Sequence, residues 1–165
     1  MQIAAAFIRR GDEVVLVLQG APGEEPAWGV PGGRVDEGEL VPEALAREVL
    51  EETGLEISFP ARLAYVHQID ERGPVRLVGG REPGSGYLAT VWAFDVEHWQ
   101  GVLDPRDPDG FVKEARFVRV GEAAALLRRT NWLELAADYL DGRVEPGSLR
   151  FERRHEDGRI ESPPA

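Results

Sequence analysis

Residues 33–55 read GRVDEGELVPEALAREVLEETGL, and the prediction of the fold rests on this stretch. Pro42 stands where a proline favours the first turn of a helix, and Gly54 stands where a glycine commonly ends one. We therefore expect a helix from about Pro42 to Thr53. Apolar residues recur within it at helical spacing and predict one buried stripe, made of Leu45, Ala46, Val49, Leu50 and Thr53.

Three glutamates, Glu48, Glu51 and Glu52, lie beside that stripe. The spacing i, i+3, i+4 puts their carboxylates on one helix face, where like charges destabilise a helix by about 0.2–0.5 kcal/mol per pair. A bound divalent cation would reverse that effect, and a donor set of oxygens alone suits Mg²⁺ or Mn²⁺ better than zinc. Such an ion bridges carboxylates to substrate phosphates, which indicates hydrolysis at phosphorus. A solvated surface helix is the alternative, and the helix by itself leaves both open.

Residues around the glutamates could support such a site. Arg47 could pair with Glu51, four residues on, or with Glu39 from the preceding loop. A guanidinium fork would hold a carboxylate in one orientation for the metal. The Gly32-Gly33 turn can bring backbone groups close to the metal and to phosphates.

The whole segment resembles the Nudix box, whose pattern is glycine, five residues, glutamate, seven residues, then Arg-Glu-apolar-any-Glu-Glu-any-Gly-apolar. Such a match arises by chance on the order of once in 10⁷ windows or more rarely. The stretches Trp28–Gly32 and Val112–Val120 also resemble parts of this family, its lead-in and its later loop and strand. The defining positions of the box are all matched, by Gly33, Glu39, Arg47, Glu48, Val49, Glu51, Glu52, Gly54 and Leu55.

The resemblance implies a Nudix fold, an α/β/α sandwich around a mixed β-sheet, and it implies roles for individual residues. Glu48, Glu51 and Glu52 would be metal ligands, joined by a backbone carbonyl of Gly32 or Gly33. Arg47 and Glu39 would orient these ligands. The general base is left open by the resemblance, with three candidates: Glu48, Glu51 and Glu114.

Composition agrees with one globular domain over residues 1–165, which includes a short polar C-terminal tail from about residue 155. The net charge of −11 disfavours a nucleic-acid-binding protein, which needs a basic surface. The absence of cysteine excludes disulfides, thiolate zinc sites and cysteine nucleophiles. No stretch approaches eighteen consecutive apolar residues, so no membrane span is expected and a cytoplasmic location is the default.

The remaining elements predict an α/β or α+β chain. Apolar runs predict strands at residues 2–8, 14–18, 62–69, 87–96, 115–120 and, near the end of the chain, 149–152. Helices are expected at residues 122–129 and 132–140. A long glycine-rich connection, Asp70–Gly86, is expected to gate substrate or to form a hairpin loop.

The substrate is expected to be a small nucleotide. Markers of the ADP-ribose, dinucleoside-polyphosphate and coenzyme A subclasses of the resembled family are missing, which leaves a nucleoside triphosphate pyrophosphohydrolase or a broad-specificity nucleotide hydrolase. An ADP-ribose or nucleotide-sugar pyrophosphatase and a non-catalytic nucleotide sensor are the alternatives. Isomerisation of an isoprenoid diphosphate is disfavoured, because members of the resembled family use a cysteine for that reaction and this chain has none.

Some polar and aromatic side chains have two interpretations. Trp28 could stack on a nucleobase or pack in the core, and Arg34, beside the glycine turn, could bind phosphate. His67 is interpreted as a packed or surface histidine in preference to an acid–base group. Core contacts or contacts in a homodimer are expected of the remaining tryptophans, Trp92, Trp99 and Trp132.

Overall fold

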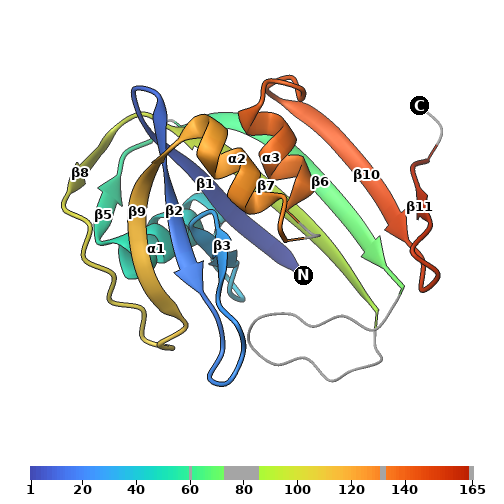
Figure 1. The fold of residues 1–165 in the computed structure, drawn as a ribbon, viewed down its shortest axis with the longest axis horizontal. Helices are drawn as coiled ribbons and strands as arrows, with labels where there is room; N and C mark the ends of the chain where they lie inside the picture. The colour runs from blue at the N-terminus through green and yellow to red at the C-terminus, as the bar shows by residue number, and fades with distance from the viewer. Residues whose placement is uncertain (60, 73–85, 131–132, 164–165) are drawn as a thin grey trace.

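The computed structural model describes residues 1–59, 61–72, 86–130 and 133–163. Figure 1 shows a strongly twisted sheet with α1 behind it and α2 and α3 in front, which confirms the predicted α/β/α sandwich. The helices are α1 (Val41–Thr53), α2 (Val120–Leu127) and α3 (Glu134–Leu140). No described helix has both the length and the apolar character that crossing a bilayer requires.

Within the described residues the main sheet has nine strands, in the order β11-β10-β6-β7-β1-β2-β3, with β4 paired to β1 and β9 paired to β2. It is mixed, because β1 runs parallel to β7 and β10 runs parallel to β6. The strands are β1 (Gln2–Arg10), β2 (Glu13–Gln19), β3 (Ala27–Gly29), β4 (Gly32–Arg34), β6 (Arg62–Glu71), β7 (Tyr87–Val96), β9 (Val112–Arg119), β10 (Ser148–Arg154) and β11 (Ile160–Glu161). A small second sheet pairs β5 (Leu55–Ile57) with β8 (Trp99–Gly101).

The apolar run of β1 is buried on both faces of the sheet, as its sequence predicts. Alternate side chains of a strand point to opposite faces. Ala5 and Phe7 therefore join the core under α2 and α3, while Ala6 and Ile8 join the core under α1. Burying a side chain such as Phe7 or Ile8 fully contributes about 1.5–3 kcal/mol, so β1 ties the two layers of the sandwich together.

Helix α1 begins one residue before the predicted start and ends at the predicted residue. The Glu43 carboxylate accepts the Leu40 amide at 2.8 Å, which caps its first turn. Gly54 ends the helix in the left-handed region with a φ of 79°. The predicted stripe is wrong at Leu50, which is 47% exposed because it lies about 100° around the helix from the buried Val49.

The C-terminal part of the chain differs most from the sequence prediction. Strand β10 pairs with β6 over its whole length and is longer than the predicted strand at 149–152. Part of the segment predicted to be a tail turns back as β11, so that Arg154 pairs with Ile160 in a hairpin. Most of the predicted 70–86 connection, Trp132 at the start of the predicted last helix, and the final two residues lie outside the described residues.

A buried polar cluster around Asp95 joins four elements. Asp95, at the end of β7, is 2% exposed. Its carboxylate accepts hydrogen bonds from Arg9 Nε of β1 at 2.6 Å, from Arg62 Nη2 of β6 at 2.8 Å and from the Tyr139 hydroxyl of α3. The cluster therefore fixes α3 to the sheet, next to the aromatic contacts of Tyr139 with Phe7 and Tyr65.

We predict that Asp95→Asn lowers the free energy of unfolding by about 3–5 kcal/mol, because it leaves the Arg9 charge without its buried partner. Arg62→Gln is the matched control: the Arg62 side chain is 61% exposed, so its loss costs about 1 kcal/mol or less. Urea unfolding followed by fluorescence measures both. Equal losses in the two variants would contradict the assigned role of Asp95.

Candidate functional site

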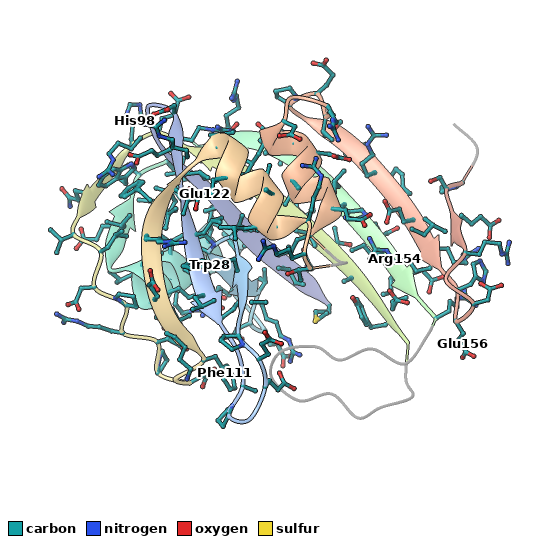
Figure 2. The ribbon with its side chains drawn as sticks, in the orientation of Figure 1. Trp28, His98, Phe111, Glu122, Arg154 and Glu156 are labelled. Atoms are coloured by element: carbon teal, nitrogen blue, oxygen red, sulfur yellow. The ribbon has the colours of Figure 1, made fainter. Side chains whose placement is uncertain are left out.

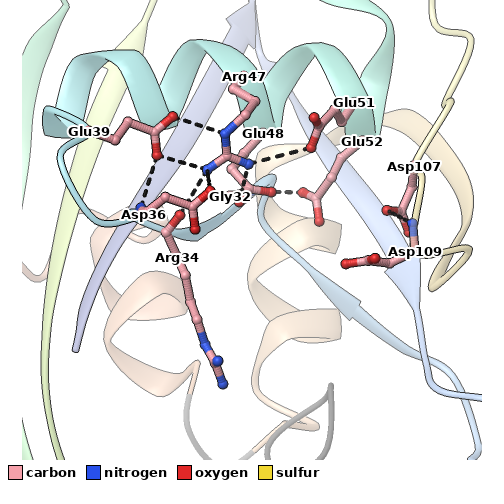
Figure 3. Close-up of polar contacts among 10 residues, drawn as sticks. All are labelled: Gly32, Arg34, Asp36, Glu39, Arg47, Glu48, Glu51, Glu52, Asp107 and Asp109. Carbon is pink, nitrogen blue, oxygen red and sulfur yellow. Dashed lines mark hydrogen bonds and ion pairs between the residues drawn. The ribbon is translucent and has the colours of Figure 1, made fainter.

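The three glutamates of α1 line one cavity of about 540 Å³. Their position follows from the helix, since residues i, i+3 and i+4 share a face. Figure 3 shows Glu48, Glu51 and Glu52 projecting from α1 toward Gly32 and, across a gap, toward Asp107 and Asp109. The face is therefore not an open, solvated surface but one wall of a concave site.

Glu52 is the most buried of the three, at 7% exposure. Its Oε2 accepts the Gly32 amide at 2.8 Å. The pKa of this carboxyl is raised to about 8, mainly by burial and also by the nearby charges of Glu48 and Asp107, whereas the Gly32 amide opposes the shift. Burial also raises the pKa of Glu48. Two neighbouring carboxyls thus resist ionisation where they stand.

The glycines beside these carboxylates are required by space. A Cβ on Gly33 would lie 2.4 Å from the Glu48 carboxylate, and a Cβ on Gly32 would lie 2.2 Å from the Ala4 carbonyl oxygen. Gly32 also has a φ of 147°, in the region that favours glycine. Only glycine lets β4 approach both β1 and the carboxylates of α1 so closely, which places backbone groups directly in the site.

Arg47 holds the acidic groups together. Its Nε and Nη2 donate to the two oxygens of Glu39, each at 2.9 Å, and its Nη1 donates to Glu48 at 2.8 Å and to Glu51 at 3.5 Å. The bidentate contact lowers the pKa of Glu39 to about 2. Its Nη2 also donates to the Arg34 carbonyl at 3.0 Å, so the guanidinium links helix, loop and β4 (Figure 3). Both partners considered for Arg47 from the sequence are contacted, Glu39 more closely than Glu51.

The donor set fits a hard divalent cation. Carboxylate oxygens and glycine carbonyls are the ligand types that Mg²⁺ and Mn²⁺ prefer. Two carboxyls with raised pKa values stand where added positive charge would favour their ionised forms. Across the described residues no three acidic or histidine side chains already surround one point at ligand distance, since Glu48 and Glu51 turn toward Arg47.

The opposite wall of the cavity is largely apolar. It is built from β1, β6, β7 and α3, on the face of the sheet that α3 covers. The side chains that line it include Ile3, Tyr65, Ile69, Val91, Leu133 and Ala136. A site with carboxylates at one side and an apolar, aromatic wall at the other suits a ligand that carries both phosphates and a flat ring.

Arg34 lines the same cavity and its side chain is exposed. Figure 3 shows the Arg34 side chain extended away from Arg47 and from the carboxylates that Arg47 contacts. The structure thus brings together the predicted ligands, both glycines, the orienting pair and this arginine.

Two predicted residues, Trp28 and Glu114, are not among those that line the cavity. Both pair with Leu18 across β2, one from β3 and the other from β9. The Trp28 ring packs against the core and carries the Arg116 guanidinium at 4.4 Å from its centroid (Figure 2). Substrate binding by Trp28 and base catalysis by Glu114 stay predictions, and the core interpretation of Trp28 fits its contacts.

Sequence reasoning missed Asp107 and Asp109, which line the cavity from the loop before β9. Asp107 accepts the amides of Phe111 at 2.6 Å and of Val112 at 2.9 Å, so its loop is held in a fixed turn. A signal was present in DPRDPDG at residues 104–110, where three aspartates alternate with turn-forming residues. His67, interpreted as packed or surface, is buried at 3% exposure but also lines the cavity.

Solved structures resemble this fold. A MutT protein from Bacillus halodurans superimposes with a TM-score of 0.65 at 17% identity, covering 98% of this chain and 94% of that one. A NUDIX hydrolase from Nitrosomonas europaea gives a TM-score of 0.60 at 26% identity, covering 88% of this chain and 91% of that one.

Sequence relatives carry names that refer to oxidised nucleotides. Human 8-oxo-dGDP phosphatase NUDT18 is 37% identical over 63% of this chain and 32% of its own length. This chain thus spans about a third of the first curated relatives it matches. A Mycobacterium tuberculosis protein, whose name gives it a provisional assignment as 8-oxo-dGTP diphosphatase 2, is 42% identical over 77% of this chain and 96% of its own.

The model of the NUDIX domain family matches residues 1–139, which contain the carboxylate helix, the glycine turn and Arg47. With the α/β/α fold and the complete box at residues 33–55, that match shows that the chain belongs to the Nudix family.

Proposed function

We propose that the chain catalyses the divalent-metal-dependent hydrolysis of a phosphoanhydride bond in a nucleoside di- or triphosphate. One observation carries the proposal: the carboxylates of α1 and the close-packed turn at Gly32 form one side of a cavity whose other side is apolar and aromatic. The first side suits a metal and phosphates, and the second suits a base and sugar.

We assign the metal, Mg²⁺ with Mn²⁺ as an alternative, to Glu48, Glu51 and Glu52 with a backbone carbonyl of Gly32 or Gly33. When bound, it would neutralise phosphate charge and favour ionisation of an attacking water. Arg47 and Glu39 would hold the ligands in orientation, since the guanidinium already contacts two of the three. Of the proposed bases, Glu48 and Glu51 line the cavity and Glu114 does not, so we assign proton acceptance to the first two.

The proposed substrate class is the oxidised purine nucleotides, with release of the nucleoside monophosphate. Support comes from the names of two relatives, an 8-oxo-dGDP phosphatase and a provisional 8-oxo-dGTP diphosphatase. The apolar and aromatic wall of the cavity, which suits a flat purine ring, supports it as well. Arg34 is the side chain that we assign to phosphate, because it is exposed at the cavity beside the glycine turn.

A panel of nucleotides tests the proposal. Oxidised and unmodified nucleoside di- and triphosphates, ADP-ribose and nucleotide sugars are each incubated with the protein and Mg²⁺ or Mn²⁺, and products are identified by chromatography and phosphorus NMR. Nucleoside monophosphate is the expected product. Thermal stabilisation by a nucleotide without any turnover would instead indicate a sensor.

Glu52→Gln is predicted to lower kcat by about 10²-fold or more, the scale seen when an electrostatic contribution to the transition state is removed. The same change removes a buried carboxylate and is not expected to lower the free energy of unfolding. Glu37→Gln, an exposed glutamate of the same loop–helix segment, is the matched control and should leave kcat unchanged. A comparable loss of kcat in Glu114→Gln would contradict the assignment of the base.

Removing either member of the Arg47–Glu39 pair is predicted to weaken metal affinity or activity by about 10–100-fold, the usual effect of losing a group that orients metal ligands. The double variant Arg47→Ala/Glu39→Ala should lose little more than either single variant, because both changes break the same bidentate contact. Initial rates against Mg²⁺ concentration measure this effect. Fully additive losses would show that the two residues act separately.

Mg²⁺ affinity is predicted to rise with pH up to about 8, because the raised pKa of Glu52 makes a proton compete with the metal. Without metal, stability changes with pH in the opposite direction. The pKa of this carboxyl in the unfolded chain is the ordinary 4.5, so the protein loses stability as pH rises from there to about 8. Calorimetric titration of Mg²⁺ between pH 6 and 9 measures the trend. An equally steep trend in Glu52→Gln would contradict it.

A further inference from the structure

A buried histidine stands on the apolar wall of the cavity, and nothing assigned above uses it. His67 lies on β6 between Tyr65 and Ile69, with which it shares a face of the sheet. It is 3% exposed and lines the cavity, opposite Val91 of β7. A polar ring on an otherwise apolar wall is placed to select among ligands, since such pockets discriminate through a few polar groups.

The outer side of this ring faces a carboxylate from β10. His67 Nε2 lies 3.2 Å from Glu152 Oε2, although the alignment is not that of a full hydrogen bond. Arg154 Nη2 contacts the same oxygen at 3.0 Å (Figure 2 labels Arg154). Together these neighbours lower the pKa of Glu152 to about 2, the contact with His67 being the larger cause. Glu152 is therefore ionised at neutral pH and can only accept a proton.

This arrangement comes from a part of the chain beyond the match to the family model. That match ends at residue 139, whereas β10 spans Ser148–Arg154. Parallel pairing sets Arg150 opposite His67 and Glu152 opposite Ile69. Because alternate residues share a face, the Glu152 side chain lies on the same face of the sheet as His67, displaced along the strand to the level of Ile69. Glu152 is not among the residues that line the cavity, so it acts on a ligand only through His67.

The contact with Glu152 fixes what the histidine offers. In the neutral ring one nitrogen carries hydrogen and the other a lone pair. The negative charge of Glu152, 3.2 Å from Nε2, favours the tautomer with hydrogen at Nε2, which leaves the lone pair at Nδ1. Because Nε2 is turned to β10, Nδ1 is the ring nitrogen left for a molecule in the cavity.

Resting on the function proposed above, we propose that His67, oriented by Glu152, determines the substrate by accepting a hydrogen bond from a purine that carries N–H at ring position 7. An 8-oxo-purine has that N–H, whereas N7 of unmodified guanine is itself an acceptor. Two acceptors facing each other leave a buried lone pair unpaired, which disfavours the unmodified base. His67 would thus be a specificity residue and Glu152 a positioning residue.

Binding of the monophosphates 8-oxo-dGMP and dGMP, measured by calorimetry without divalent cation at pH 8.5, tests the proposal. Leaving out the metal removes the carboxylate site from the comparison. We expect the native protein to prefer 8-oxo-dGMP about tenfold or more, the scale of one buried hydrogen bond made or left unmade.

His67→Leu removes the acceptor, and Glu152→Gln keeps the shape of the positioning residue but removes its charge. Both should reduce the preference to near unity. His67→Asn, which retains an oxygen close to the position of Nδ1, should restore part of it. His98→Gln is the matched control, since His98 is exposed and does not line the cavity. Glu152→Gln stays informative if the leucine variant does not fold, because the Glu152 side chain is 21% exposed whereas that of His67 is 4% exposed.

An unchanged preference in His67→Leu or Glu152→Gln would overturn the proposal, and so would an equal loss in His98→Gln. The absence of any preference in the native protein would overturn it as well. A lack of nucleotide turnover with a preserved binding preference would instead remove the proposed hydrolysis and leave the recognition intact. The two ideas therefore fail separately.

Discussion

The Glu52 carboxylate lies buried against the backbone of β4, with the Gly32 amide donating to it and two further acidic side chains close by. Burying a charge is costly unless it is paired or coordinates a metal, and Glu52 resists ionisation for that reason. The chain retains this arrangement at the end of an otherwise well-packed helix. Sites of function are where such local costs are found, because the ligand offsets them. The metal site that we propose depends on this arrangement, because it holds acidic groups close together.

The acidic groups and the backbone of β4 come together because β4 lies unusually close to both β1 and α1. Glycine at positions 32 and 33 lets β4 lie against β1 on one side and against Glu48 on the other. Arg47 supplies the positive charge that keeps Glu48 and Glu51 from repelling each other, and Glu39 fixes the guanidinium. The cavity extends from this cluster to the apolar wall under α3, and β10, beyond the family match, places Glu152 next to His67 of that wall. The proposed metal site therefore lies on α1 and β4, whereas the proposed specificity residue and its partner lie on β6 and β10.

Local features could be predicted from the sequence and contacts between distant segments could not. The carboxylate face of α1 follows from helical spacing, and β1 follows from a continuous apolar run. The pairing of His67 with Glu152 depends on the parallel register of β6 and β10, and no local pattern predicts a register between distant strands. The same limit explains why Trp28 and Glu114 were expected in the site but do not line the cavity. The direction of both side chains depends on strand pairing with Leu18, which the sequence does not predict. Asp107 could not be predicted for the same reason, because it reaches the cavity from a loop more than fifty residues beyond Glu52 in the sequence.

Anomalous diffraction from crystals grown with Mn²⁺ would test the central claim most directly. We expect a peak between Glu48, Glu51 and Glu52, next to the backbone of Gly32 or Gly33. A peak elsewhere, or none in this cluster while the ion binds in solution, would contradict the assignment of the metal site and the hydrolysis that depends on it.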